Sequence, residues 1–205
     1  MRWATRGTVL AADAAMRHGF VINIGGGFHH AKPDDGEGFC IYSDIGLAVK
    51  HLRDTEQISD KDNVAYINLD AHQGNGVCHV FMHDRRLRIF DMYNGDIYPR
   101  CDRTAARRID ADFPLQSGCA DEQYLEILRE QLPQFLDGCA PAFAIYNAGM
   151  DIFADDPLGG LSISAAGIIE RDVYTVGELR KRGIPSVMVL SGDTRSKATS
   201  LSRTP

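Results

Sequence analysis

The sequence of 205 residues contains no apolar run near the roughly 20 residues that a membrane-spanning helix requires. It has no surplus of basic residues either, since a formal net charge of −6 gives no positive field to attract nucleic-acid phosphates. Its five cysteines are odd in number and lack C-x-x-C spacing, which favours a reducing compartment over a disulfide-bonded scaffold. No apolar signal-peptide segment follows Met1. We therefore expect one globular domain in the cytoplasm, or in the nucleus of a eukaryotic source, that binds neither membranes nor nucleic acids directly.

Short apolar segments alternate with longer amphipathic ones along most of the chain, a pattern typical of strands and helices in turn. The expected strands cover residues 20–24, 64–69, 87–91, 143–147 and 186–190. The expected helices cover residues 8–17, 43–53, 77–82, 121–135 and 164–182, with Pro133 bending or ending the fourth. Residues 92–118 are expected to form a long irregular segment. This order predicts an α/β domain with a mainly parallel sheet and helices on both faces.

An Asp-x-His motif, Asp70 and His72, follows the apolar segment 64–69. In an extended backbone these two side chains project to the same side and can converge on one point. An oxygen and a nitrogen donor aimed together suit zinc or a similar borderline cation. The alternative is structural: an aspartate that caps a helix and a histidine satisfied by backbone groups.

Polar side chains also follow two other expected strands. His29 and His30 come after the three glycines at 25–27, and Asp151 comes after the strand at 143–147. Ligands of open parallel sheets bind beyond the carboxyl ends of the strands, so we expect these groups to meet Asp70 and His72. Two carboxylates and one imidazole would leave a zinc ion an open position, and the paired histidines could act as acid and base. A surface histidine pair and a turn aspartate are the alternatives.

Several motifs together resemble the histone deacetylase superfamily, most closely its class IV branch. They run in family order between about residues 19 and 192 and read GGGFHH, GFC, LDAHQGNG, IYNAGMD and LGGLSIS. The resemblance implies an arginase/deacetylase-like α/β fold of three layers, α-β-α, around a mainly parallel central sheet. It also implies zinc-dependent hydrolysis of the amide bond in acylated lysine.

The resemblance assigns roles to individual residues of this chain. The zinc ligands would be Asp70, His72 and Asp151, holding one ion per chain. The acid–base pair would be His29 and His30, with His30 as the main base. The remaining assignments are Gly27, Phe39 and Tyr98 along the acyl-lysine tunnel, and Asn68 and Asn75 as supports behind the site.

The chain departs from the family at Asn68, where the family usually has an acid that supports the first histidine and a monovalent cation. A neutral amide stabilises an imidazolium less than a carboxylate does. We therefore expect a lower proton affinity at His29 and a weaker potassium site.

A second departure follows the last expected strand, where the family has Gly-Gly-Tyr and the tyrosine hydroxyl polarises the scissile carbonyl. Here the chain reads Ser191-Gly192-Asp193, and no tyrosine follows. Inserting one guanine after the Gly192 codon can restore Gly-Gly-Tyr, so we hypothesise a shifted reading frame. We expect residues 1–192 to be a partial catalytic domain without the family's N-terminal segment, and residues 193–205 to be an aberrant, disordered tail.

The sequence thus predicts a zinc-dependent hydrolase that removes acyl groups from an acylated protein or a small acylated amine. One alternative is an inactive module that still binds zinc and an acyl ligand, and another is a gene fragment without function. A two-metal ureohydrolase is disfavoured because the sequence supplies only one ligand set. Acyl length, acceptor and oligomeric state stay open at this stage.

Overall fold

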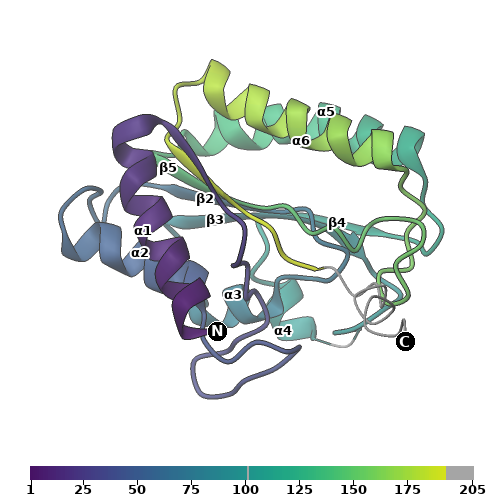
Figure 1. Ribbon diagram of the computed structural model, residues 1–205, viewed down its shortest axis with the longest axis horizontal. Coiled ribbons are helices and arrows are strands. Elements are labelled where there is room, and N and C mark those ends of the chain that lie inside the picture. Colours follow the sequence, from purple (N-terminus) through teal and green to yellow (C-terminus); the bar gives the residue numbers. More distant parts are fainter. Residues whose placement is uncertain (101, 193–205) are drawn as a thin grey trace, which may run out of the picture.

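The computed structural model describes residues 1–100 and 102–192, which form three layers, a sheet between two sets of helices (Figure 1). The expected disordered tail at 193–205, and the place of the family tyrosine, lie outside the described residues. No helix in the described part of the chain is long and apolar enough to cross a bilayer.

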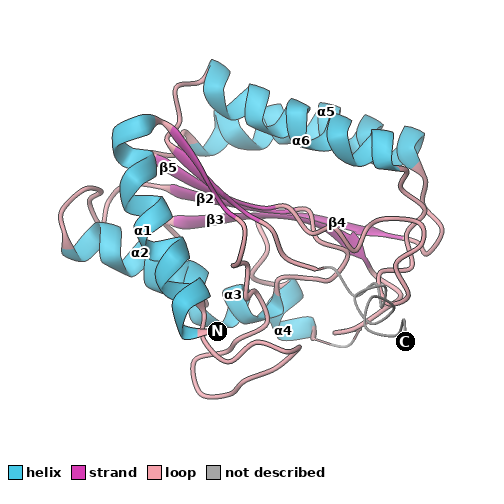
Figure 2. Cartoon of the chain, viewed as in Figure 1, coloured by secondary structure: helices cyan, strands magenta, loops and turns pink. Residues whose placement is uncertain are grey.

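A six-stranded sheet forms the middle layer, and all of its strand pairs are parallel (Figure 2). In chain order the strands are β1 (Phe20–Asn23), β2 (Val64–Asn68), β3 (Leu87–Asn94), β4 (Ala111–Leu115), β5 (Phe143–Asn147) and β6 (Ser186–Val189). Their order across the sheet is β1-β6-β5-β2-β3-β4. The central strands β2 and β5 are buried on both faces, which matches their unbroken apolar sequences.

Helices cover both faces of this sheet, and each face has its own hydrophobic core. One face packs against α1 (Arg2–His18), α2 (Asp44–Asp54), α3 (Asn75–Val80) and α4 (Arg103–Ala106). The other packs against α5 (Asp121–Cys139) and α6 (Ala165–Lys181), the pair at the top of Figure 1. Ser43 and Ser164 are the N-caps of α2 and α6, and their hydroxyls accept from the N–H groups of Gly46 and Gly167. The expected α/β class and parallel sheet are confirmed.

The strand register places polar residues side by side near the carboxyl ends of the central strands. Asn68, the last residue of β2, lies opposite Asn147 on β5 and Asp91 on β3. The loops that follow β2 and β5 carry Asp70, His72 and Asp151, so parallel pairing brings these distant segments together.

The expectation of an irregular segment from 92 to 118 is wrong. Strand β3 continues to Asn94, α4 occupies residues 103–106, and β4 pairs with β3 at the edge of the sheet. Strand β4 contains Pro114 and is only half buried, so it lacks the apolar signal of the inner strands. An edge strand tolerates proline because one side of its backbone needs no partner.

Pro133 does not end helix α5 either, since the helix continues to Cys139. Proline cannot donate to the carbonyl four residues earlier, which is that of Arg129. The hydroxyl of Tyr174 on α6 donates to that carbonyl at 3.1 Å instead. A tertiary contact therefore satisfies the group that the proline leaves free.

Candidate metal and acid–base site

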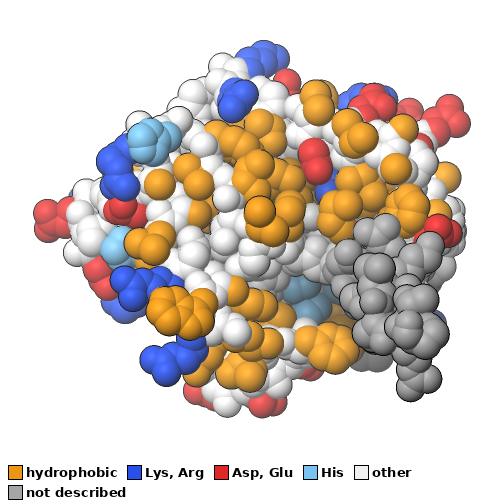
Figure 3. Space-filling model, in the orientation of Figure 1, with side chains coloured by type: hydrophobic (Ala, Val, Ile, Leu, Met, Phe, Trp, Pro, Cys, Tyr) orange, Lys and Arg blue, Asp and Glu red, His pale blue; other side chains and the backbone are white. Residues whose placement is uncertain are grey.

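A cavity of about 370 Å³ lies beyond the carboxyl ends of β1, β2, β5 and β6. Figure 3 shows histidine atoms at the floor of a hollow bordered by hydrophobic side chains. The site residues predicted from the sequence that line it are Gly27, His29, His30, Phe39, Asp70, His72, Tyr98 and Asp151.

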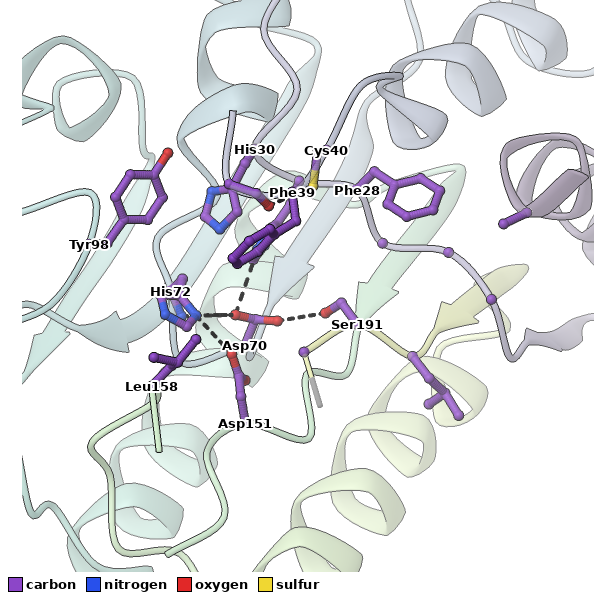
Figure 4. A pocket seen from close by; sticks show the side chains of 18 residues that line it. Phe28, His30, Phe39, Cys40, Asp70, His72, Tyr98, Asp151, Leu158 and Ser191 are labelled. Atoms are coloured by element: carbon purple, nitrogen blue, oxygen red, sulfur yellow. Dashed lines mark hydrogen bonds and ion pairs between the residues drawn. The ribbon is translucent and has the colours of Figure 1, made fainter. Parts of the chain in front are cut away.

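Asp70, His72 and Asp151 point toward one another in this cavity (Figure 4). Nδ1 of His72 lies 2.8 Å from Oδ2 of Asp151 and 3.2 Å from Oδ1 of Asp70. One ligand atom from each residue falls within 4.8 Å of the others, and both carboxylates are buried. An imidazole nitrogen and two carboxylate oxygens at this spacing fit a zinc ion that keeps a position open.

Short hydrogen bonds hold these donors in place. Oδ2 of Asp70 accepts from the Ser191 hydroxyl at 2.6 Å, on the side away from His72 (Figure 4). Oδ1 of Asp151 accepts from the backbone N–H of Ala71 at 3.0 Å. The loop after β2 therefore fixes a carboxylate of the loop after β5, so neither carboxylate turns freely.

A buried arginine forms hydrogen bonds with both of these loops. Arg171 on α6 donates from Nη1 to the carbonyls of Leu69, at 3.0 Å, and Gly149, at 2.7 Å. Its Nε bonds Asp172, and its guanidinium lies over the Tyr146 ring. The sequence analysis missed this residue. The available signal was a charged side chain at a position that helical spacing places on the buried face of α6.

The two neighbouring carboxylates determine the pKa of the His72 imidazole. Burial alone would lower its pKa, but hydrogen bonds and charge from Asp151 and Asp70 outweigh burial and raise the pKa to about 10. The pocket around His72 thus stabilises positive charge.

His29 and His30 lie beside this cluster, and their Nδ1 atoms contact neutral side-chain amides. Nδ1 of His29 lies 3.2 Å from Oδ1 of Asn68 and 3.0 Å from Nδ2 of Asn147. Nδ1 of His30 lies 2.6 Å from Oδ1 of Asn75. Burial lowers the pKa of His29 to about 4 and that of His30 to about 3, the latter with a contribution from the neighbouring His29. Both rings are therefore neutral bases at pH 7.

A model of the histone deacetylase domain matches residues 1–202 of the chain. The chain belongs to the histone deacetylase family. It is 45% identical over 186 residues to histone deacetylase 2 of Arabidopsis thaliana, covering 91% of this chain and 47% of that protein. It is 33% identical over 189 residues to an uncharacterised Picosynechococcus protein, covering 92% and 61%. It is 28% identical over 171 residues to histone deacetylase 8 of Xenopus tropicalis, covering 78% and 45%. The chain thus spans about half the length of these curated relatives.

The residues that the deacetylase resemblance assigns to the substrate tunnel surround the cavity. Gly27 has a φ of 88°, and a Cβ there would lie 2.4 Å from Oδ1 of Asn147, so only glycine fits. Phe39 is 85% exposed at the rim, and the ring of Tyr98 packs edge-on against His30 at 5.1 Å. Leu158, which the sequence analysis did not single out, adds a further apolar side chain. These positions suit an aliphatic chain, while their roles stay predictions.

Deacetylases usually have an acid at the position of Asn68. The side-chain amide of Asn68 makes hydrogen bonds through both its nitrogen and its oxygen. Its Nδ2 donates to Oδ1 of Asp91 at 2.7 Å and to the His72 carbonyl at 2.9 Å, while Oδ1 accepts from the Tyr66 hydroxyl at 3.0 Å. An N–H group therefore already satisfies two oxygens that could face a cation. The predicted weak potassium site is consistent with this arrangement and stays a prediction.

Proposed function

We propose that this deacetylase-family chain is a zinc-dependent amidohydrolase that removes acyl groups from acylated lysine or a related amine. The observation that carries the proposal is the cavity itself. It brings a candidate ligand set, the buried Asp70 and Asp151 and the partly buried His72, beside two histidines that stay neutral. Metal-assisted amide hydrolysis needs both groups, because water must lose a proton and the amine must gain one.

The three ligands would hold one zinc ion, which when bound acts as a Lewis acid toward a carbonyl oxygen and lowers the pKa of water. The contact between His30 and Asn75 supports a role for His30 as the base, because Asn75 occupies Nδ1 of His30 and leaves Nε2 for the reacting groups. Nε2 of His29 lies 3.6 Å from Oδ1 of Asp70, which places this ring between the ligand set and the amides of Asn68 and Asn147. Both rings can exchange a proton near neutral pH only when developing charge in the site raises their pKa.

The cavity also supports an aliphatic substrate arm. Phe39 and Tyr98 flank its opening, and Gly27 lets the backbone approach the bound chain closely. Apolar walls around a few convergent polar groups are typical of small-molecule sites. An acyl-lysine side chain or the arm of an acylated polyamine fits this description.

A second candidate is a module that binds zinc and an acyl ligand without turnover. The sequence after Gly192 favours it, because Asp193 and Thr194 stand where deacetylases have the carbonyl-polarising tyrosine. Loss of one such donor costs roughly 100- to 1,000-fold in rate.

The deciding experiment loads the chain with zinc and measures metal content, hydroxamate affinity and release of acetate or longer acids from acyl-lysine peptides and acetylpolyamines. Zinc binding with slow, measurable hydrolysis is expected. Zinc and hydroxamate binding without turnover would favour the binding module, and no zinc binding would overturn both. Asp151→Asn should lose zinc, whereas the same substitution at the exposed Asp155 should retain it.

A further inference from the structure

The loop between β1 and α2 ends in a tight turn that lies directly on His30. The backbone N–H of Cys40 donates to the Glu37 carbonyl at 2.8 Å, and Gly38 and Phe39 both have positive φ, 50° and 63°. A Cβ at Gly38 would lie 2.3 Å from Cδ2 of the His30 ring. The turn therefore places Phe39 at the mouth of the cavity and Glu37 close to the partner of His30.

The Glu37 carboxylate gathers three donors at this point. It accepts from Nζ of Lys32 at 2.6 Å and from Nδ2 of Asn75 at 3.0 Å, and the Tyr98 hydroxyl also bonds it. Burial alone would raise the pKa of Glu37, but the bonds from Lys32 and Tyr98 lower it below its ordinary value. Glu37 is thus ionised at neutral pH and can only accept hydrogen bonds.

This acceptor decides which way the Asn75 amide faces. Because a carboxylate cannot donate, the NH₂ group of Asn75 must point to Glu37, and its carbonyl oxygen must point to His30. That oxygen in turn only accepts, so Nδ1 of His30 carries the proton at their 2.6 Å contact. Nε2 of His30 is then left unprotonated, as a base requires.

The neighbouring His29 has two partners of opposite kind at its Nδ1. Its Nδ1 faces an acceptor, Oδ1 of Asn68, and a donor, Nδ2 of Asn147, at nearly equal distances of 3.2 and 3.0 Å. Either tautomer of His29 can bond only one of these two partners through Nδ1, and the other partner keeps a bond elsewhere, because Nδ2 of Asn147 also donates to Oδ1 of Asn68. Asp91 accepts from the Asn68 amide as Glu37 accepts from the Asn75 amide, so the difference lies in the additional donor, Asn147, at His29. Nδ1 of His30 faces the acceptor oxygen that Glu37 orients.

We propose that Glu37 is a positioning residue that, through the Asn75 amide, holds His30 in the tautomer with a proton on Nδ1 and a free Nε2. This role rests on the proposed function of His30 as the base. Glu37 itself does not reach the reacting groups. No residue type in the turn pattern indicates this role, which depends on the packing of the turn against α3.

Nitrogen-15 NMR of the histidine rings in the zinc-loaded chain tests the proposal without requiring turnover. The wild type should show His30 as a single neutral tautomer with Nδ1 protonated. In Glu37→Ala the side-chain amide of Asn75 can flip and present either its oxygen or its NH₂ group to His30. The nitrogen-15 shifts of His30 should therefore move toward a mixture of both tautomers. Asp34→Ala removes the same charge from an exposed position of the same loop and should change nothing at His30.

A rescue separates positioning from general loss of structure. In Asn75→Asp the partner of His30 is itself a carboxylate, which accepts in any orientation, so adding Glu37→Ala should leave the single tautomer intact. If the chain hydrolyses acyl-lysine, Glu37→Ala should lower kcat about tenfold with little change in KM, and the double variant should lose less. His30 protonated on Nε2 in the wild type, or His30 shifts unmoved by Glu37→Ala, would overturn the proposal. A fixed tautomer in a chain without turnover would instead count against the proposed function alone.

Discussion

Three imidazoles share one cavity, yet His72 on one side and His29 and His30 on the other differ in proton affinity. All three are largely buried, with 13%, 4% and 5% of their side chains exposed. The pKa of His72 rises to about 10 while the pKa values of His29 and His30 fall to about 4 and 3. Burial lowers the pKa of each ring, so the sign of the shift is decided by the partners. Nδ1 of His72 contacts two carboxylates, whereas Nδ1 of His29 and of His30 faces amides. The Asp70 carboxylate lies farther from His29, at 3.6 Å from its Nε2.

This contrast divides the cavity into a half that attracts positive charge and a half that keeps its bases neutral. A cation and a general base need these opposite environments at close range, because a protonated base cannot accept another proton. The ring centres of His30 and His72 are only 5.8 Å apart. Whether the partner of a histidine is Asp or Asn therefore affects the pKa of that histidine more than its place in the cavity does.

The largest expected effect comes from loosening the charged half through Arg171→Met. This change leaves the carbonyls of Leu69 and Gly149 without their buried donor, so the two ligand loops lose their common anchor. Zinc affinity should fall about tenfold or more, as is typical when outer supports of metal ligands are removed. Competition with a chromogenic chelator measures it. The same substitution at Arg180, on the exposed part of α6, is the control, and equal affinities for both variants would refute this role.

Asn68→Asp should make the neutral half of the cavity, which contains His29 and His30, resemble the charged half. A carboxylate beside Nδ1 of His29 should raise the pKa of His29 by about one unit or more, measured by NMR titration of its ring. The new carboxylate would also lie 2.7 Å from Asp91, a contact that a cation relieves. Unlike the wild type, the variant should therefore gain thermal stability in potassium over lithium chloride. An unchanged His29 titration would show that its partner does not set its pKa.

The smallest expected effect is a pH dependence of stability from His29. Its folded pKa of about 4 lies below the ordinary 6.5, so between these values the unfolded chain binds more protons. The stabilising contribution is complete above pH 6.5 and is lost as the pH falls toward 4. In metal-free protein, the wild type should lose about 1 kcal/mol more than His29→Gln between pH 6 and pH 5. Urea unfolding at both pH values measures this, and parallel losses in the two proteins would contradict it.

Much of the fold, and the meeting of three candidate metal donors, could be predicted from the sequence because their signals are local. The inner strands are unbroken apolar segments, and Asp70, His72 and Asp151 directly follow two of them. Strand β4 escaped prediction because an edge strand needs neither two apolar faces nor a full set of donors. The course of α5 beyond Pro133 could not be predicted either, since it depends on a hydroxyl from another helix.

The supports of the site were harder to predict than its ligands for a related reason. Asn147 lies beside Asn68 only through the register of β5 with β2, and Arg171 reaches the ligand loops from a distant helix. Glu37 bonds Asn75, which lies at the start of helix α3. The partners in such contacts depend on tertiary structure, so no spacing in the sequence predicts them, although helical spacing does place Arg171 on the buried face of α6.

The most direct test of the account is a calorimetric titration of the metal-free chain with zinc at neutral pH, in buffers of different ionisation enthalpy. The account predicts one zinc ion per chain and release of about one proton, because His72 must lose its proton to bind while His29 and His30 have none to lose. Failure to bind zinc would contradict the charged half of the site. Release of three protons would contradict the neutral half, because His72 and a water bound to the ion account for at most two.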